Sequence, residues 1–435
     1  MGSWSRRRRV VAAIFGLAVS PWVPPAAAQL RLPPITLPSP GGLRDLTAPA
    51  VGTATSVAAA ELADVRKLRI LELLRTHREL IDVDRVGNPI VRGEIVAFAP
   101  TEAGLNGATA AGLAVLRREA LAGLDAELVI LSVLRSNSIH RALKRLRQAD
   151  PAGTYDYNHV YLGVGDAIGQ TSAASPHSDP GAATRVLGSV GLIDTGVDVG
   201  HTAFKDVQVE LWGCAGKAVP DGHGTAVGSL LAGHDDTFHG AAPGARLFAA
   251  DVYCGRPDGG AVDLIAAAFA WLAAQRVPVI SVSLVGPRDE TLAAVVARVI
   301  ARGQIIVAAV GNDGPSAPPL YPAAYPGVIA VTGVDAHRHV LLEANRGPHV
   351  AFAAPGADMV AATVGGGYRE VRGTSFAAPI VAGLLAQRCS LPGPSCAGEA
   401  TRALAQEAID LGRKGRDPVY GFGLVGESVR TAPNK

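Results

Sequence analysis

Three polar residues stand in settings that suit nucleophilic catalysis. Asp194 follows the apolar run Val190–Ile193, at the carboxyl end of an expected strand, where open α/β sheets build their sites. His223 lies in Asp-Gly-His-Gly-Thr and Ser375 in Gly-Thr-Ser-Phe-Ala-Ala-Pro, each at the start of an expected helix. Backbone N–H groups at a helix start are unpaired within the helix and favour negative charge.

These residue types complement one another chemically. A serine hydroxyl is a weak nucleophile until a neighbouring base takes its proton. Imidazole, with an ordinary pKa of about 6.5, can accept that proton and return it under mild conditions. A carboxylate beside the imidazole holds the required tautomer and stabilises the imidazolium. In such a set Ser375 would be the nucleophile, His223 the general base and Asp194 the group that orients the base. Each segment alone is an ordinary strand end, helix start or turn.

The elements around these residues predict an α/β fold with a mainly parallel sheet flanked by helices. Strands that are apolar throughout and alternate with helices are typical of a parallel sheet covered on both faces. The expected strands are residues 186–193, 245–252, 277–284, 305–310 and 328–334. The expected helices are residues 261–274 and 291–301.

A smaller α+β unit is expected before the sheet, over residues 93–163. Its expected order is strand 94–99, a helix around 108–119, strand 127–134, helix 139–146 and strand 155–162. Residues 29–92 are expected to hold a flexible leader and an amphipathic helix over 61–80, whose basic face we expect to be solvated. Residues 164–184 resemble a linker, and residues 185–430 hold the three polar residues.

The N-terminus predicts export. Arg6–Arg9 precede an apolar run, Val10–Val19, and the small residues 26–28 follow, which is the layout of a signal peptide over residues 1–28. The run is too short for a permanent membrane anchor, so a secreted or periplasmic product without a stable anchor is expected. The formal net charge of +2 gives no reason to expect nucleic acid as a partner.

Four cysteines would be exported with the chain, and an even number in an oxidising compartment suggests disulfides. Cys389 and Cys396 bracket a turn-forming Ser-Leu-Pro-Gly-Pro-Ser loop, which would leave Cys214 to pair with Cys254. Four buried thiols are the alternative. None of the cysteines has metal-site spacing, and no metal ligand is predicted.

Together, the Asp194, His223 and Ser375 segments resemble the ordered Asp, His and Ser blocks of the subtilisin-like serine proteases. The resemblance extends over roughly residues 186–425 and implies hydrolysis of protein or peptide substrates through an acyl-enzyme. It implies an oxyanion hole from the Asn312 side chain and the Ser375 backbone N–H. It also implies the substrate-binding positions Ser283, Leu284, Val285, Gly286, Ala309 and Gly311.

Residues 93–163 resemble the propeptide domain of the same family, which implies an intramolecular chaperone and inhibitor and a self-processing precursor. The linker 164–184 would then hold the processing site. An unrelated N-terminal domain is the alternative, since an analogy of fold does not establish function.

Two positions depart from the family pattern. Val285 stands where the family commonly has glycine, so we expect it to narrow the first specificity pocket, unless it packs against apolar neighbours instead. His201-Thr-Ala203 replaces a common His-Pro-Asp, which removes a carboxylate that often serves calcium. No cofactor is expected to be required, and calcium is unsupported at that position.

Two rival functions predict different sequence features. An esterase or lipase predicts Gly-x-Ser-x-Gly and the order Ser, Asp, His, whereas Ser375 has Ala377 two residues later and comes last. An inactive binding protein would keep the fold without the complete set of Asp194, His223, Ser375 and Asn312.

Overall fold

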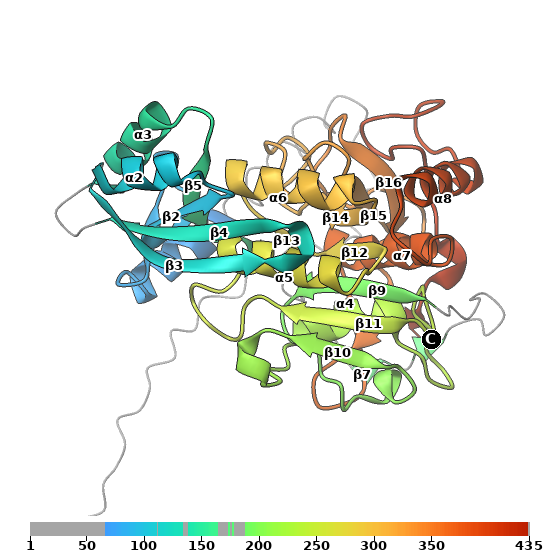
Figure 1. Ribbon diagram of the computed structural model, residues 1–435. Helices are drawn as coiled ribbons and strands as arrows, with labels where there is room; N and C mark the ends of the chain where they lie inside the picture. Colours follow the sequence, from blue (N-terminus) through green and yellow to red (C-terminus); the bar gives the residue numbers. More distant parts are fainter. Residues whose placement is uncertain are drawn as a thin grey trace, which may run out of the picture. The chain divides into compact units, whose positions relative to one another are not determined.

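The computed structural model describes residues 66–110, 112–133, 138–163, 173–174, 176–177 and 188–433. Its centre is a seven-stranded sheet in the order β10-β11-β9-β12-β14-β15-β16, in which every neighbouring pair is parallel (Figure 1). The strands are Val209–Trp212 (β10), Arg246–Asp251 (β11), Ser189–Asp194 (β9), Val279–Val282 (β12), Ile305–Ala309 (β14), Ile329–Val334 (β15) and Val350–Pro355 (β16). The predicted α/β fold with a parallel sheet is confirmed.

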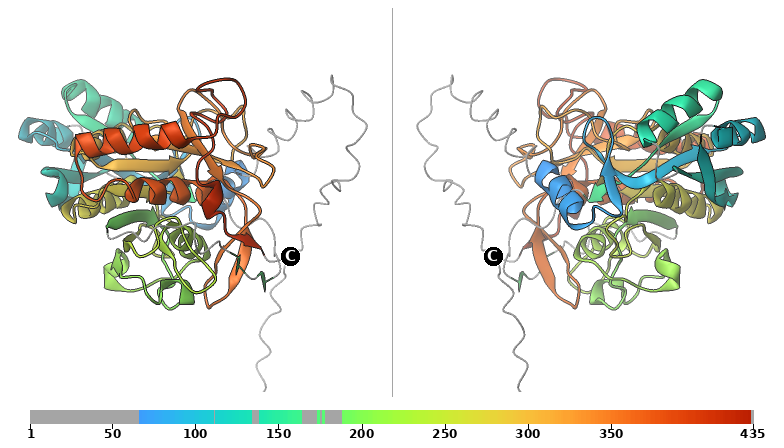
Figure 2. Two further views of the ribbon diagram at one scale, coloured as in Figure 1. Left: turned by 90° about the vertical axis from the view of Figure 1, so that its right-hand side faces the viewer. Right: turned by 90° about the vertical axis from the view of Figure 1, so that its left-hand side faces the viewer.

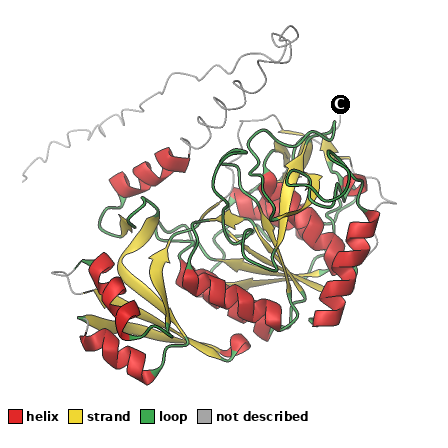
Figure 3. Ribbon diagram, turned by 90° about the horizontal axis from the view of Figure 1, so that it is seen from above, coloured by secondary structure: helices red, strands yellow, loops and turns green. Residues whose placement is uncertain are grey.

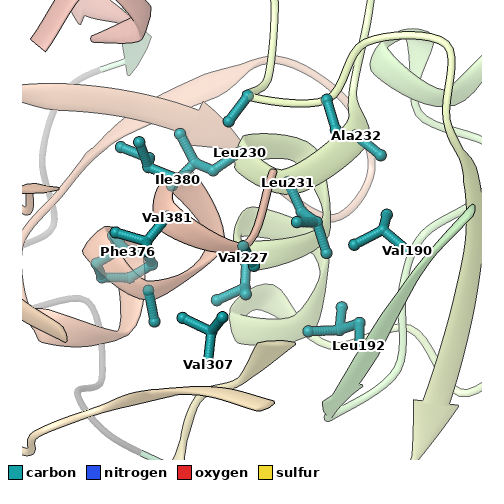
Figure 4. Close-up of a cluster of buried hydrophobic side chains, with 14 of the residues drawn as sticks. Val190, Leu192, Val227, Leu230, Leu231, Ala232, Val307, Phe376, Ile380 and Val381 are labelled. Carbon is teal, nitrogen blue, oxygen red and sulfur yellow. The ribbon is translucent and has the colours of Figure 1, made fainter. Parts of the chain in front are cut away.

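Helices cover both faces of this sheet, which explains why its strands are apolar throughout. Helices α4 (Gly222–Ala232) and α7 (Thr374–Ala386) pack on one face with Leu192 and Val307 (Figure 4). Helices α5 (Val262–Ala274) and α6 (Glu290–Ala301) pack on the other. Successive strand residues therefore enter opposite cores.

The five predicted strands and two predicted helices of this region correspond to β9, β11, β12 with β13 (Leu284–Val285), β14, β15, α5 and α6. Strands β10, β16, β17 (Met359–Ala362) and β18 (Tyr368–Val371) were not predicted, nor was helix α8 (Pro394–Glu407). Helix α8 lies beside α7 near the C-terminal end of the described chain (Figure 2). Among the described residues, no helix is long and apolar enough to cross a membrane.

The N-terminal unit is an antiparallel sheet of five strands, Ile81–Val83 (β1), Pro89–Phe98 (β2), Leu113–Leu121 (β3), Ala126–Val133 (β4) and Thr154–His159 (β5). Helices α2 (Glu102–Ala110) and α3 (Ile139–Ala149) pack on one face (Figure 3). Residues of the other face, such as Val96 and Ile130, share a core with α5 and α6. The sheet begins at residue 81, so the unit extends further toward the N-terminus than the expected 93–163.

The helix predicted around residues 108–119 is wrong. Helix α2 ends at Ala110, and β3 occupies Leu113–Leu121 in antiparallel pairing with β4. The sequence Leu-Ala-Val-Leu-Arg-Arg-Glu-Ala-Leu has good helix propensity, but pairing with a buried neighbouring strand overrides that preference. The strands and helix predicted around 94–99, 127–134, 139–146 and 155–162 are found as β2, β4, α3, and β5 with β6 (Leu162–Gly163).

Residues 66–76 are helical, within the amphipathic helix expected over 61–80. The expectation that its basic face is solvated is confirmed at Lys67, Arg75 and Arg78, which are exposed. It is wrong at Arg66, whose side chain is 13% exposed and forms an ion pair with Asp313 at 3.4 Å. Leu73 and Leu74 of this helix pack against a small buried cluster made of Ile81, Val91, Val160 and Ala261. Residues 1–28, the leader up to residue 65 and most of the expected linker lie outside the described residues.

Two disulfides join neighbouring elements, as expected from the sequence. Cys214 bonds Cys254 across the ends of β10 and β11, and Cys389 bonds Cys396 between α7 and α8. The alternative of four free thiols is excluded because the structure leaves no free cysteine.

We expect the longer disulfide loop to contribute more to stability. In the chain-entropy account, loops of 40 and 7 residues give about 4 and about 2 kcal/mol respectively. Double Cys→Ser variants of each pair, compared by urea unfolding in a Ser375→Ala background that limits self-digestion, measure the difference. Equal losses of unfolding free energy would contradict the prediction.

Candidate active site

Asp194 ends the central strand β9 and is 1% exposed. Its Oδ1 accepts the backbone N–H of Thr195 at 2.7 Å and lies 2.7 Å from Nδ1 of His223. A carboxylate can only accept, so Nδ1 of His223 carries the hydrogen and Nε2 faces the other way as the basic nitrogen in the neutral ring. The structure thus brings Asp194 and His223 together as the sequence predicted.

The position of His223 is fixed at the first turn of α4. Asp221, the N-cap, accepts the backbone N–H of His223 at 2.9 Å. The Thr195 hydroxyl donates to Asp221 at 2.8 Å and accepts the Gly224 N–H at 2.8 Å. A Cβ on Gly224 would stand 2.2 Å from the Thr195 carbonyl oxygen, so only glycine permits this approach.

Thr195 and Asp221 are therefore positioning residues that the sequence did not single out. They tie the end of β9 to the start of α4 and so fix the spacing between Asp194 and His223. A signal was available for Asp221, since an Asp directly before an expected helix is a common N-cap. No such signal marked Thr195.

Ser375 lies in the first turn of α7 and is fully buried. The ring of the next residue, Phe376, has its centroid 5.7 Å from that of His223, which brings the start of α7 to the imidazole. The hydroxyl of Ser283 donates to the Ser375 carbonyl at 3.0 Å and fixes this turn against the strand that follows β12. Three distant segments therefore meet at one point.

Asn312 lies beside the same turn. Its Oδ1 accepts the backbone N–H of Thr374 at 3.1 Å and the Thr374 hydroxyl at 3.0 Å. This pairing fixes the amide orientation and leaves Nδ2 directed at Gly373, where a Cβ would stand 2.8 Å from it. Gly373 has φ of +141°, a conformation that favours glycine. An amide donor and the start of α7 thus lie together, which suits stabilisation of an oxyanion.

The expected substrate-binding positions divide into two groups. Leu284 and Val285 form β13, which is the edge strand next to the site, and Gly286 continues it. Gly311 lies beside Val285, since a Cβ on Gly311 would be 3.6 Å from Val285 Cγ1. Ala309 instead belongs to the core beneath the sheet, and Ser283 is fully buried against Ser375, so these two shape the site from behind.

A strand from the N-terminal unit occupies the edge next to the site. Strand β6 pairs antiparallel with β13, with Gly163 opposite Leu284 and Leu162 opposite Val285. On the other side of this segment, Val160 bridges to Ala261. No local pattern predicted this pairing, because it joins segments far apart in the chain.

Tyr161 anchors this segment. Its backbone N–H donates to Gly260 at 2.8 Å, and Tyr253 Oη donates to its carbonyl at 2.9 Å. The side chain is fully buried, its hydroxyl donates to the Pro287 carbonyl at 2.6 Å, and burial raises its pKa well above the usual value. A Cβ on Gly286 would stand 2.6 Å from the ring, so glycine makes room for it.

An ionic cluster lies where β5 meets α6. His159 Nδ1 is 2.7 Å from Asp289 and Nε2 is 3.4 Å from Asp84. Burial disfavours the imidazolium, but hydrogen bonds to these two carboxylates and the charge of Asp156 raise the His159 pKa to about 9. Burial, with the charge of Asp289, raises the pKa of Asp156 to about 6.

The spacing of Asp156, His159 and Asp289 would suit a metal ion, but both His159 nitrogens are directed at carboxylates. A protonated His159 explains the cluster without a cation.

His201 lies in the segment His201-Thr-Ala203, where the family commonly has His-Pro-Asp. It is buried, its Nδ1 accepts the Ala203 N–H, and its Nε2 donates to the Gly367 carbonyl. Both His201 ring nitrogens therefore have backbone hydrogen-bond partners.

Solved structures with a similar fold include fervidolysin from Fervidobacterium pennivorans, described as a keratinolytic enzyme related to subtilisin. Its TM-score is 0.63 at 20% identity, over 78% of this chain and 61% of that one. At this identity the likeness concerns the fold. The patellamide maturation protease PatA has a TM-score of 0.50 at 26% identity, over 57% of this chain and 97% of that one.

Sequence relatives give the same result. Subtilisin DY of Bacillus licheniformis is 33% identical over 244 residues, which are 54% of this chain and 88% of the relative. Subtilisin E of Bacillus subtilis is 32% identical over 266 residues, 57% of this chain and 67% of the relative. A model of the subtilase family matches residues 188–423, more than half of the chain. The chain therefore belongs to the subtilase family of serine endopeptidases.

Proposed function

We propose that this chain is the precursor of an exported serine endopeptidase that hydrolyses peptide bonds with Ser375, His223 and Asp194. The observation that carries the proposal is the 2.7 Å hydrogen bond between Asp194 and His223, whose ring lies beside Phe376 at the start of the helix that holds Ser375. It supplies an oriented base beside a hydroxyl.

The proposed reaction has two halves. His223 Nε2 takes the Ser375 proton while Oγ attacks the substrate carbonyl, and Asn312 Nδ2 with the Ser375 N–H stabilises the oxyanion. The carbon–nitrogen bond then breaks, the leaving amine takes the proton from His223, and an acyl-enzyme remains. Water, deprotonated by His223, attacks the ester and restores Ser375. Side chains and water carry every proton, so the mechanism requires no cofactor.

We also propose that residues 66–163 are the inhibitory part of the precursor. The pairing of β6 with β13 supports this, because a bound peptide substrate would add to the same strand edge. Helix 66–76 adds to the inhibitor. Arg66 forms an ion pair with Asp313, the residue after Asn312. Leu73 and Leu74 pack against the same small cluster as Leu162 of β6.

The register of β6 indicates a specific bond for self-cleavage. Gly163 lies opposite Leu284, and Ser283, the residue before Leu284, binds the Ser375 carbonyl. The next residue in the chain, Val164, would therefore supply the carbonyl that Ser375 attacks, and the Val164–Gly165 bond would be cut. This bond falls within the linker expected from the sequence.

Export rests on the N-terminal sequence, which lies outside the described residues, and on the two disulfides, which form in oxidising compartments. Relatives include proteins named an extracellular protease and an intracellular serine protease, both of Bacillus subtilis, so family membership does not fix the compartment. We propose a secreted or periplasmic enzyme, with residues 1–28 removed.

We expect the wild-type precursor to release a mature chain that begins at Gly165, and Ser375→Ala to remain uncut and lack proteolysis. Loss of the nucleophile lowers turnover on the order of 10⁶-fold in a subtilisin, a value taken from that enzyme. Casein digestion, a fluorophosphonate label and N-terminal sequencing measure these outcomes. Ser428→Ala, at an exposed serine, is the control. Maturation of purified Ser375→Ala would refute self-processing.

We expect residues 66–164, made separately, to inhibit the mature enzyme in a peptide-cleavage assay. Tyr161→Ala in this segment should weaken inhibition at least 100-fold, because truncating a buried aromatic costs about 3–5 kcal/mol. Val86→Ala, at an 83% exposed position, should leave it unchanged. Residues 79–164, without the helix, should inhibit more weakly. No inhibition by residues 66–164 at high micromolar concentration would refute the inhibitory role.

We expect this inhibition to weaken as pH rises from 7 to 9.5. In the complex the pKa of His159 is about 9, above its ordinary 6.5, so its contribution is complete below about pH 6.5 and is lost as pH rises through 9. The raised pKa of Asp156, about 6, acts in the same direction at lower pH, while Asp84 and Asp289 face the same imidazole.

The inhibition constant at each pH, measured against an uninhibited reaction at that pH, tests this expectation. We expect the inhibition constant to rise at least tenfold between pH 7 and 9.5. This is less than the full pKa shift of His159 would give, because the surroundings of buried charges relax. His159→Gln in the segment should remove most of the pH dependence. A wild-type inhibition constant that is independent of pH would contradict the assignment.

A further inference from the structure

Val285 and Leu320 form a hydrophobic cluster of two residues beside the active site. They are 4% and 8% exposed, and they pack apart from the two large cores on the faces of the parallel sheet. Gly311 lies against both, since a Cβ there would stand 2.5 Å from Leu320 Cδ1 and 3.6 Å from Val285 Cγ1. Leu320 comes from the loop between β14 and β15, which the sequence did not connect with substrate.

The position of this pair follows from the parallel sheet. Strands β12 and β14 are neighbours, so the segments that leave their carboxyl ends, Ser283–Val285 and Val310–Asn312, run side by side. A carbonyl attacked by Ser375 must lie between Ser283, which binds Ser375, and Asn312, which faces Gly373. The side chain next to that carbonyl therefore enters the space between the two segments, where Val285 and Leu320 meet.

Leu320 is held in this space by the backbone of its loop. The Gly286 N–H donates to Tyr321 at 2.9 Å and the Tyr321 N–H donates to Gly286 at 3.1 Å. These two bonds fasten the residue after Leu320 to the residue after Val285. The pair is consequently part of the framework and not a loose loop contact.

We propose that Leu320, together with Val285, fills the first specificity pocket and restricts the substrate residue before the cut bond to side chains no larger than valine. This inference rests on the proposed function. Val285 was expected either to narrow the pocket or to pack against an apolar neighbour. Both expectations hold together here, because the neighbour, Leu320, occupies the same pocket. The bond proposed for self-cleavage follows Val164, which is within this limit.

Two p-nitroanilide substrates test the inference, Tyr-Leu-Gly-Ala and Tyr-Leu-Gly-Phe, whose first three residues copy residues 161–163. The wild-type enzyme should cleave the Ala substrate with at least tenfold higher kcat/KM. Leu320→Ala and Val285→Gly should each raise the ratio of kcat/KM for Phe to kcat/KM for Ala at least tenfold. The double variant should be non-additive, since the side chains touch. Leu342→Ala, at a 60% exposed position, should behave as wild type.

Fluorophosphonate titration of active sites normalises every rate, so a loss of folded enzyme is not mistaken for a loss of specificity. Leu320→Val provides a milder variant with an intermediate expected gain for Phe. Equal cleavage of Ala and Phe by the wild type, or equal changes for both substrates in the variants, would overturn the inference while leaving the proposed function intact. Absence of labelling and of cleavage of either substrate would instead overturn the proposed function and this inference with it.

Discussion

The rest of the site depends on the hydrogen bond between Asp194 and His223. It requires the end of a central strand and the start of a helix to lie so close that Asp194 Oδ1 and His223 Nδ1 are 2.7 Å apart. Asp194 is almost fully buried at this position. Thr195 and Asp221 make that meeting rigid, and Gly224 permits the backbone approach. The parallel sheet brings Asn312, which follows β14, to the same end. The hydrogen bonds of Asn312 to Thr374 then hold the start of α7, with Ser375, beside it.

The sequence predicted what is local or strongly patterned. Asp194, His223 and Ser375 lie in short segments with distinctive neighbours, and the doubly buried strands show as apolar runs. The disulfide of Cys389 with Cys396 followed from a short turn-forming loop. These features depend on residues close in the chain, where composition and spacing are informative.

The features that were missed depend on distant contacts. The segment Leu113–Leu121 favours a helix by propensity and becomes a strand only because β4 is beside it. Arg66 belongs to a helix with an ordinary charged face, and nothing near it indicates that Asp313 would pair with it. Leu320 is one apolar residue in a proline-rich loop, and its role becomes visible only when that loop folds back onto Gly286.

One constraint links the catalytic site with the segment that covers it. Helices α5 and α6 follow β11 and β12 in the chain, so their N-termini lie at the same edge of the sheet as the active site. Two side chains of β5 cap them, as Asn158 accepts the Asp263 N–H at 3.2 Å and Asp156 accepts the Glu290 N–H at 2.9 Å. Any segment that covers this edge of the sheet must hydrogen-bond the N–H groups at those helix ends as well as the backbone of β13. In the proposed inhibitory complex, release of residues 66–163 would leave these helix ends to be hydrogen-bonded by water.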